Sequence, residues 1–237
     1  MSTAVRETKK ALRKDIKDRL STLSAVEVGA QSNIAQLLIL SLPQYKHAGK
    51  LGIYMSMPTG EAQTELLVRD ALHSGKRVYV PCIHSVPKPG MKSGTGKVMD
   101  MLRLSSIEEY GGLERDSWGI PHLPHDSLEG RENAIGGSGT SPDTEVAHDG
   151  DGGLDLIVVP GVAFDAEMNR MGHGAGFYDR FLTRFCEGEK RRRPFLVGLC
   201  LAEQILPKGQ IMMQEWDWKV DAIAVGDGRL LASAEGA

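Results

Sequence analysis

A glycine-rich segment in the second half of the chain has the composition of a phosphate-binding turn. It runs from Asn169 to Asp179 with the sequence NRMGHGAGFYD, after an apolar strand and before an amphipathic helix. Alternate glycines let backbone N–H groups approach an anion, and the helix N-terminus adds its dipole and unpaired donors. Arg170 supplies a planar guanidinium, and Asp179 can hold Mg²⁺ beside phosphates. The spacing matches neither a Walker A loop nor G-x-G-x-x-G, so an unliganded glycine-rich turn stays an open alternative.

Lys9 and Arg13 form a second candidate group for anions. They lie four residues apart, so they share one face of the helix predicted over residues 4–20, beside an apolar stripe that includes Ile16. A solvated helix face with extended cationic side chains is the ordinary explanation of such a row. Contact with nucleotide phosphates is the functional alternative.

The loop from Met55 to Glu61 follows a predicted parallel strand, at the end of the sheet where α/β proteins bind ligands. Glu61 there is suited to accept hydrogen bonds from a heterocycle, although spacing alone fits a surface carboxylate equally well. Trp118, in a loop-like setting, either stacks on a flat ligand or covers the core.

Three other patterns carry weaker signals. His122 and His125 resemble a metal-binding pair, but they have no third ligand nearby in sequence. The basic run 190–193 reads as a solvated turn. Asp217 and Asp221, near the last predicted strand, are ordinary surface carboxylates unless the fold brings one of them toward Asp179.

The elements that must position these groups alternate along the chain. A second helix is predicted from a capping box at Ser24 to Pro43, which ends it. Further helices are predicted over 64–73 and 177–185, and strands over 50–56, 77–83, 98–104, 154–160, 194–201 and 220–225, the last of the chain. Strands that alternate with helices indicate an α/β fold with a mostly parallel sheet.

Two stretches interrupt this pattern. Residues 121–153 are rich in glycine and acidic residues and poor in large apolar side chains, so we expect a flexible insertion within a single domain spanning 1–237. Residues 84–96 are predicted to form a second, shorter loop.

Composition narrows the function classes. The chain has 237 residues, 41% of them hydrophobic, and a formal net charge of −3, which argues against a general nucleic-acid-coating surface. No apolar run approaches the ~18 residues of a membrane span. The 3 cysteines are widely spaced and fit a reducing compartment. We therefore expect a cytoplasmic protein without membrane or nucleic-acid partners, with a mitochondrial fraction left open by the basic N-terminus.

Taken together, these residues resemble the 5-formyltetrahydrofolate cyclo-ligase (methenyltetrahydrofolate synthetase) family. The resemblance rests on Lys9-x-x-x-Arg13, on 55–64, on Ser117-Trp118-x-Ile120-Pro121, on the block 154–182 and on Asp217-x-x-Val220-Asp221. It implies a single three-layer α/β domain with helices on both faces of the sheet. We separately expect a monomer. The resemblance further implies an ATP- and Mg²⁺-dependent reaction that converts 5-formyltetrahydrofolate to 5,10-methenyltetrahydrofolate by phosphorylating the formyl oxygen, followed by attack of N10 and release of ADP and phosphate.

The resemblance also assigns roles to residues of this chain. It implies catalytic roles for Arg170, Glu61 and Tyr178, and metal ligation by Asp179 and Asp217. The implied ATP-binding residues are Lys9, Arg13, Arg170, Met171, Gly172, His173, Gly174, Ala175, Gly176, Phe177 and Tyr178. The implied folate-binding residues are Met55, Glu61, Trp118, His173, Gly174, Ala175, Gly176 and Phe177.

The chain departs from the family pattern at four places. Ala175 stands where many members have lysine, Phe177 replaces the first tyrosine of Tyr-Tyr-Asp, and Met168 replaces a frequent glycine. The insertion 121–153 is also longer than in compact members. Two other functions are compatible with the motifs: a non-catalytic nucleotide- or folate-binding regulator, and an RNA-associated protein that uses the basic run 190–193.

Overall fold

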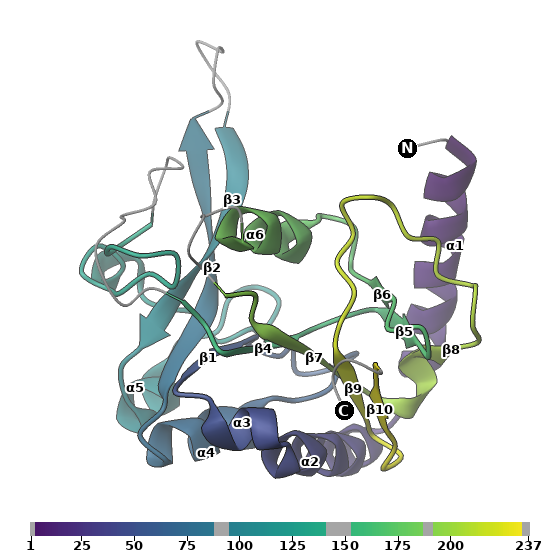
Figure 1. The fold of residues 1–237 in the computed structure, drawn as a ribbon, viewed down its shortest axis with the longest axis horizontal. Helices are drawn as coiled ribbons and strands as arrows, with labels where there is room; N and C mark the ends of the chain where they lie inside the picture. The colour runs from purple at the N-terminus through teal and green to yellow at the C-terminus, as the bar shows by residue number, and fades with distance from the viewer. Residues whose placement is uncertain (1–2, 88–94, 141–152, 187–191, 234–237) are drawn as a thin grey trace.

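The computed structural model describes residues 3–87, 95–140, 153–186 and 192–233. Its centre is a seven-stranded sheet in the order β10-β9-β7-β4-β1-β2-β3 (Figure 1). These strands are β1 (Lys50–Ile53), β2 (Arg77–Pro87), β3 (Thr95–Leu104), β4 (Leu156–Val159), β7 (Phe195–Cys200), β9 (Ala222–Val225) and β10 (Leu230–Ala232). The five inner strands pair in parallel, whereas β3 and β10 pair antiparallel at the edges. The predicted mostly parallel α/β sheet is confirmed.

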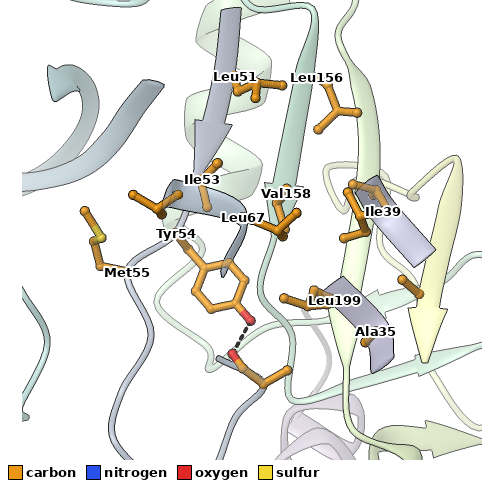
Figure 2. Packing of buried hydrophobic residues seen from close by; sticks show 14 of the residues in the cluster. Ala35, Ile39, Leu51, Ile53, Tyr54, Met55, Leu67, Leu156, Val158 and Leu199 are labelled. Atoms are coloured by element: carbon orange, nitrogen blue, oxygen red, sulfur yellow. Dashed lines mark hydrogen bonds between the residues drawn. The ribbon is translucent and has the colours of Figure 1, made fainter. Parts of the chain in front are cut away.

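Helices pack on both faces of this sheet. The helices are α1 (Thr3–Leu20), α2 (Ala25–Ser41), α3 (Pro43–His47), α4 (Glu65–His73), α5 (Ile107–Gly112) and α6 (Phe177–Cys186), with short 3₁₀ turns at His125–Ser127 and Ala202–Gln204. Side chains of β4 alternate between the two faces. Leu156 and Val158 join the apolar cluster under α2, α3 and α4, which Figure 2 shows, whereas Ile157 and Val159 join the cluster under α6.

A small second sheet links α1 to the glycine-rich segment. Its strands are β5 (Ala163–Asp165), β6 (Arg170–Met171) and β8 (Ile205–Leu206), in the order β6-β5-β8. The predicted stripe of α1 packs beside it, with Ile16 buried in the same apolar cluster as Ala163 and Met171. This packing places α1 next to the strand that carries Arg170 (Figure 1).

Several predicted boundaries change. The sheet continues after the predicted last strand, because the turn at Asp227–Gly228 returns the chain antiparallel as β10. The predicted loop 84–96 is shorter, since ten consecutive positions of β2 and β3 pair across it, from Val78 with Leu104 to Pro87 with Thr95.

The predicted flexible insertion is also partly wrong. Its residues 121–140 pack against β3: the Ala134 backbone N–H donates to Met101 at 2.9 Å, and Leu123 and Ile135 are buried. The few apolar residues of this stretch are concentrated where they cover the edge strand, an effect that average composition does not register. The rest of the insertion, 141–152, lies outside the described residues.

Among the described residues, no single helix has both the length and the hydropathy of a membrane span. The pair α1–α2 meets these criteria only when its two helices, bent by 108°, are counted together.

Candidate active site

A cavity of about 610 Å³ opens where α1, the glycine-rich segment, α6 and the loop before β9 meet. Sequence reasoning named most of its lining: Lys9, Arg13, Arg170, Met171, Gly172, Gly174, Ala175, Gly176, Phe177, Asp179 and Asp217. The fold thus brings together residues from positions 9 to 217 of the chain. The cavity has the size of an ordinary small-molecule site.

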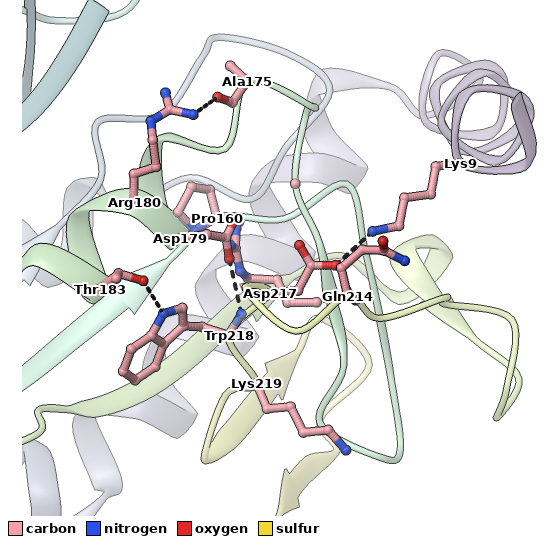
Figure 3. Close-up of polar contacts among 12 residues, drawn as sticks. Lys9, Pro160, Ala175, Asp179, Arg180, Thr183, Gln214, Asp217, Trp218 and Lys219 are labelled. Atoms are coloured by element: carbon pink, nitrogen blue, oxygen red, sulfur yellow. Dashed lines mark hydrogen bonds and ion pairs between the residues drawn. The ribbon is translucent and has the colours of Figure 1, made fainter. Parts of the chain in front are cut away.

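Lys9, on α1, and Asp217, in the loop before β9, form an ion pair at the cavity. The Lys9 Nζ lies 2.7 Å from Asp217 Oδ2, and both side chains are largely buried (Figure 3). The same carboxylate oxygen accepts the Gln214 backbone N–H at 2.9 Å, which fixes the turn that carries it. The cationic row of α1 is therefore divided, because Lys9 is buried at the cavity while Lys17 stays exposed.

A second ion pair joins Arg170 to Asp179. The guanidinium Nη2 donates to Asp179 Oδ1 at 2.7 Å, and Nη1 donates to the Pro160 carbonyl at 3.2 Å. Asp179 Oδ1 also accepts the Trp218 backbone N–H at 3.2 Å (Figure 3). Since Trp218 follows Asp217 directly, this bond brings the second carboxylate toward the first. Asp221 instead accepts hydrogen bonds from Arg193 and from the Leu196 backbone.

The glycine-rich turn between these pairs depends on glycine at two positions. Gly174 and Gly176 have φ of +106° and +67°, in the region that side chains disfavour. A side chain at Gly174 would also meet the Arg13 guanidinium carbon at 3.4 Å. Arg13 in turn donates from Nε to the Gly172 carbonyl at 2.8 Å, so the turn and α1 hold each other in place.

Arg170 is also fixed from the strand before it. Asp165 is fully buried, and its carboxylate accepts hydrogen bonds from the backbone of Glu167 and Asn169 and from the Asn169 side chain. Met168, within this turn, has φ +63°, in the left-handed region that favours glycine. The turn directs β6, and with it Arg170, along β5.

The remaining predicted folate residues form a neighbouring group rather than part of the cavity lining. Glu61 is buried and accepts the Met57 backbone N–H at 2.6 Å through Oε1. Burial raises the pKa of Glu61 to about 7, and the Met57 hydrogen bond opposes this rise only in part. Within the described part of the chain, the other carboxylate oxygen has no hydrogen-bond partner, so it can serve a ligand.

Met55 and Trp118 flank this loop. Met55 is buried in the apolar cluster beside Tyr54 (Figure 2). Trp118 is 72% exposed, so it does not cap the core, and the backbone at its neighbour Gly119 approaches the Pro58 ring closely. This exposure is compatible with stacking of Trp118 on a flat ligand and rules out the alternative that Trp118 covers the core.

Tyr178 lies between the two groups. Its ring faces the Arg170 guanidinium at 5.8 Å, and its hydroxyl is buried. Burial raises the pKa of Tyr178 above its usual value; the Arg170 charge opposes the rise, and the Glu61 charge adds to it. His173 is exposed and does not line the cavity; partial desolvation together with Arg13 and Arg170 lowers its pKa, which favours the neutral ring.

Sequence reasoning missed the outer wall of the cavity. This wall consists of Val98, Met99, Arg180, Phe181, Thr183, Arg184 and Trp216. Arg180 and Arg184 were detectable because they follow Asp179 on the same helix and lie one turn apart from each other. The only indication for Trp216 in the sequence was its position next to Asp217. The β3 residues carried no signal, because their pairing brings them here only in three dimensions.

The carboxylates suit a hard cation such as Mg²⁺. Asp179 and Asp217 each engage a single oxygen in hydrogen bonds, which leaves Oδ2 of Asp179 and Oδ1 of Asp217 without a partner among residues that the structure describes. Mg²⁺ typically takes one or two carboxylates together with substrate phosphates and waters. In the described ranges no three His, Cys, Asp or Glu side chains cluster as a metal site, and His122 and His125 are exposed.

Comparison with known proteins gives one consistent result. The model of the 5-formyltetrahydrofolate cyclo-ligase family matches residues 5–226. The 5-formyltetrahydrofolate cyclo-ligase of Mus musculus is 34% identical over 226 residues, covering 95% of this chain and 97% of its own, and that of Saccharomyces cerevisiae is 30% identical over 227 residues, covering 94% and 97%. The solved structure of Aquifex aeolicus 5,10-methenyltetrahydrofolate synthetase has the same fold, with a TM-score of 0.63 at 24% identity over 97% of this chain and 94% of that one.

Proposed function

The chain belongs to the 5-formyltetrahydrofolate cyclo-ligase family, and we propose that it performs the family's ring closure with the residues described above. Its activity is the conversion of 5-formyltetrahydrofolate to 5,10-methenyltetrahydrofolate. The cavity group, defined as Lys9, Arg13, Arg170, Asp179, Asp217 and the turn 172–177, would hold MgATP. The folate group, defined as Met55, Glu61 and Trp118, would hold the pterin, with 173–177 shared between the two ligands.

The observation that supports this assignment most strongly is the convergence of five cations and two carboxylates on one cavity at a helix N-terminus. The cationic side chains and the backbone donors at the N-terminus of α6 suit the negative charge of a triphosphate. Asp179 and Asp217 would hold Mg²⁺, which would neutralise phosphate charge during transfer. Most of the catalysis would then come from positioning and charge neutralisation.

The reaction needs phosphoryl transfer because an amide oxygen is a poor leaving group. The formyl oxygen attacks the γ-phosphorus, and the bond from that phosphorus to the oxygen of ADP breaks. N10 then attacks the formyl carbon, the carbon–oxygen bond breaks, and phosphate leaves with the N10 proton. Arg170 would stabilise the charge of the transferred group, and Glu61 would accept hydrogen bonds from the pterin and so fix N5 and N10.

The test of this function is formation of the methenyl product, which absorbs in the near ultraviolet. Purified protein, MgATP and 5-formyltetrahydrofolate should give this absorbance in proportion to the ADP released. Absence of product from folded protein that binds both ligands would instead favour a regulator. The monomeric state and the cytoplasmic location stay proposals, tested by light scattering and by cell fractionation.

The RNA-binding alternative finds less support. Of the basic run 190–193, the structure describes Arg192 and Arg193. Arg193 pairs with Asp221 at 2.7 Å and stacks over Trp218. This arginine has a structural partner, and residues 190–191 lie outside the described ranges.

A further inference from the structure

The hydroxyl of Tyr178 differs from those of the other buried tyrosines. Tyr54 donates to the Ala62 carbonyl at 2.6 Å, Tyr45 to Asp70 at 2.6 Å, and Tyr79 to Glu132 at 2.5 Å. The Tyr178 side chain is half-buried, and its hydroxyl is shielded from solvent but has no hydrogen-bond partner in the portion of the chain that is described. An unpaired buried hydroxyl destabilises the folded state, so its presence needs an explanation outside the free protein.

The surroundings of this hydroxyl indicate where its partner comes from. One face of the Tyr178 ring packs against Arg170, whose guanidinium holds Asp179 in the cavity group. The ring also packs against the apolar cluster that contains Met55 of the folate group. Tyr178 itself does not line the cavity that holds the phosphate-binding side chains. The hydroxyl therefore lies at the junction of the two groups.

In the proposed reaction, one substrate atom must occupy that junction. The formyl oxygen starts as part of the folate and ends as part of phosphate, so it has to reach both groups. We propose that the Tyr178 hydroxyl donates its hydrogen bond to this formyl oxygen, which makes Tyr178 a catalytic residue. The inference rests on the proposed function and assigns the hydroxyl to one atom of the substrate.

The hydrogen bond serves both bond changes without transferring a proton. During phosphoryl transfer it orients the formyl oxygen toward the γ-phosphorus. During ring closure the same oxygen bridges carbon and phosphorus, and the donor stabilises the negative charge that develops as the carbon–oxygen bond breaks. The tyrosine keeps its proton throughout, and the N10 proton leaves with phosphate, so the equation balances.

The variant Tyr178→Phe removes the hydroxyl and keeps the ring against Arg170. We expect two effects of opposite sign. The ligand-free variant should melt at the same temperature or a few degrees higher, because an unpaired buried polar group is gone. Its kcat for methenyl formation should fall about 100-fold, as when one transition-state donor is lost, while KM for MgATP changes by less than about twofold.

Tyr54→Phe is the matched control, because it deletes a buried hydroxyl that already has a partner. It should lower the melting temperature of the free protein, and its loss of kcat should be smaller than that of Tyr178→Phe. A lower melting temperature for Tyr178→Phe would show a partner in the free protein and overturn the inference. So would kcat equal to that of the unmodified enzyme. If the unmodified enzyme forms no methenyl product, the proposed function fails first, and the inference fails with it.

Discussion

The carboxylates of the cavity group and of the folate group have opposite surroundings. Asp179 and Asp217 are each paired with a cation at 2.7 Å, whereas Glu61 is buried with a single backbone donor and no cation. An ion pair keeps each aspartate charged until a charged ligand replaces its cationic partner. Burial without a cation raises the pKa of Glu61 to about 7 and leaves it free to match the donors of a neutral heterocycle. The contrast supports the proposed assignment of phosphates to the cavity group and of the pterin to the folate group.

The largest effect should come from changing a proposed metal ligand of the cavity group. Asp217→Asn removes a charge from the proposed Mg²⁺ site and leaves Lys9 without its charged partner. We expect kcat/KM for methenyl formation to fall about 1,000-fold. Asp227→Asn is the control, because Asp227 pairs with Arg229 in the exposed turn before β10 and should change the rate little. Equal rates for both variants would contradict the assignment.

Glu61→Gln tests the folate group. Because the folded-state pKa of Glu61 is raised to about 7, the folded protein binds more protons than the unfolded chain between about pH 4.5 and pH 7. The Glu61 contribution to the free energy of unfolding should thus fall as pH rises through this window, by roughly 3 kcal/mol. Glutamine keeps the Met57 hydrogen bond and should abolish this dependence.

The same variant should weaken binding of 5-formyltetrahydrofolate about tenfold or more and leave MgATP binding unchanged, because the carboxylate is lost only from the folate group. Chemical unfolding at pH 5, 6, 7 and 8 measures the first effect, and calorimetry with each ligand measures the second. An unchanged pH dependence of stability, or weaker binding of MgATP instead of folate, would contradict this division of the site.

Lys9→Met tests the role of the ion pair between Lys9 and Asp217. Without Lys9, Asp217 loses its cation, so Mn²⁺ should bind to the nucleotide-free variant more tightly than to the unmodified protein, as measured by electron paramagnetic resonance. KM for MgATP should rise about tenfold because a phosphate ligand is missing. Lys14→Met is the matched control on the same helix, since Lys14 is exposed and pairs loosely with Asp18 at 4.0 Å. A change in Lys14→Met as large as in Lys9→Met would argue against a specific role.

The smallest effect is expected from restoring a family feature. Ala175 is exposed at the cavity, and lysine there would add a cation near the phosphates. Ala175→Lys should lower KM for MgATP about threefold in low salt, with the gain lost at high ionic strength. Steady-state kinetics at two salt concentrations test this, and an improvement in folate KM alone would assign the position to the other group.

The sequence predicts most of the fold because its signals are local. Apolar runs mark β4 and β7, and Ser24 and Pro43 mark the ends of α2, whose capping box is present as expected. Part of the cavity group could be picked out from the sequence in the same way, because the spacing of Lys9 and Arg13 and of the glycines in the turn 172–177 is recognisable.

What sequence reasoning could not supply depends on distant pairing. The ion pair of Lys9 with Asp217 joins residues 208 positions apart, and the packing of 121–140 on β3 depends on a few apolar residues in a polar stretch. The unpaired Tyr178 hydroxyl is likewise a property of three-dimensional surroundings and has no signature in the residues beside it.

The central claim is that one site brings the γ-phosphate to the formyl oxygen of the folate. The most direct measurement uses 5-formyltetrahydrofolate labelled with ¹⁸O in the formyl group and examines the released phosphate by ³¹P nuclear magnetic resonance. The account predicts one ¹⁸O atom in each phosphate formed, in step with the methenyl product. Phosphate without the label, formed at the same rate as the methenyl product, would contradict it.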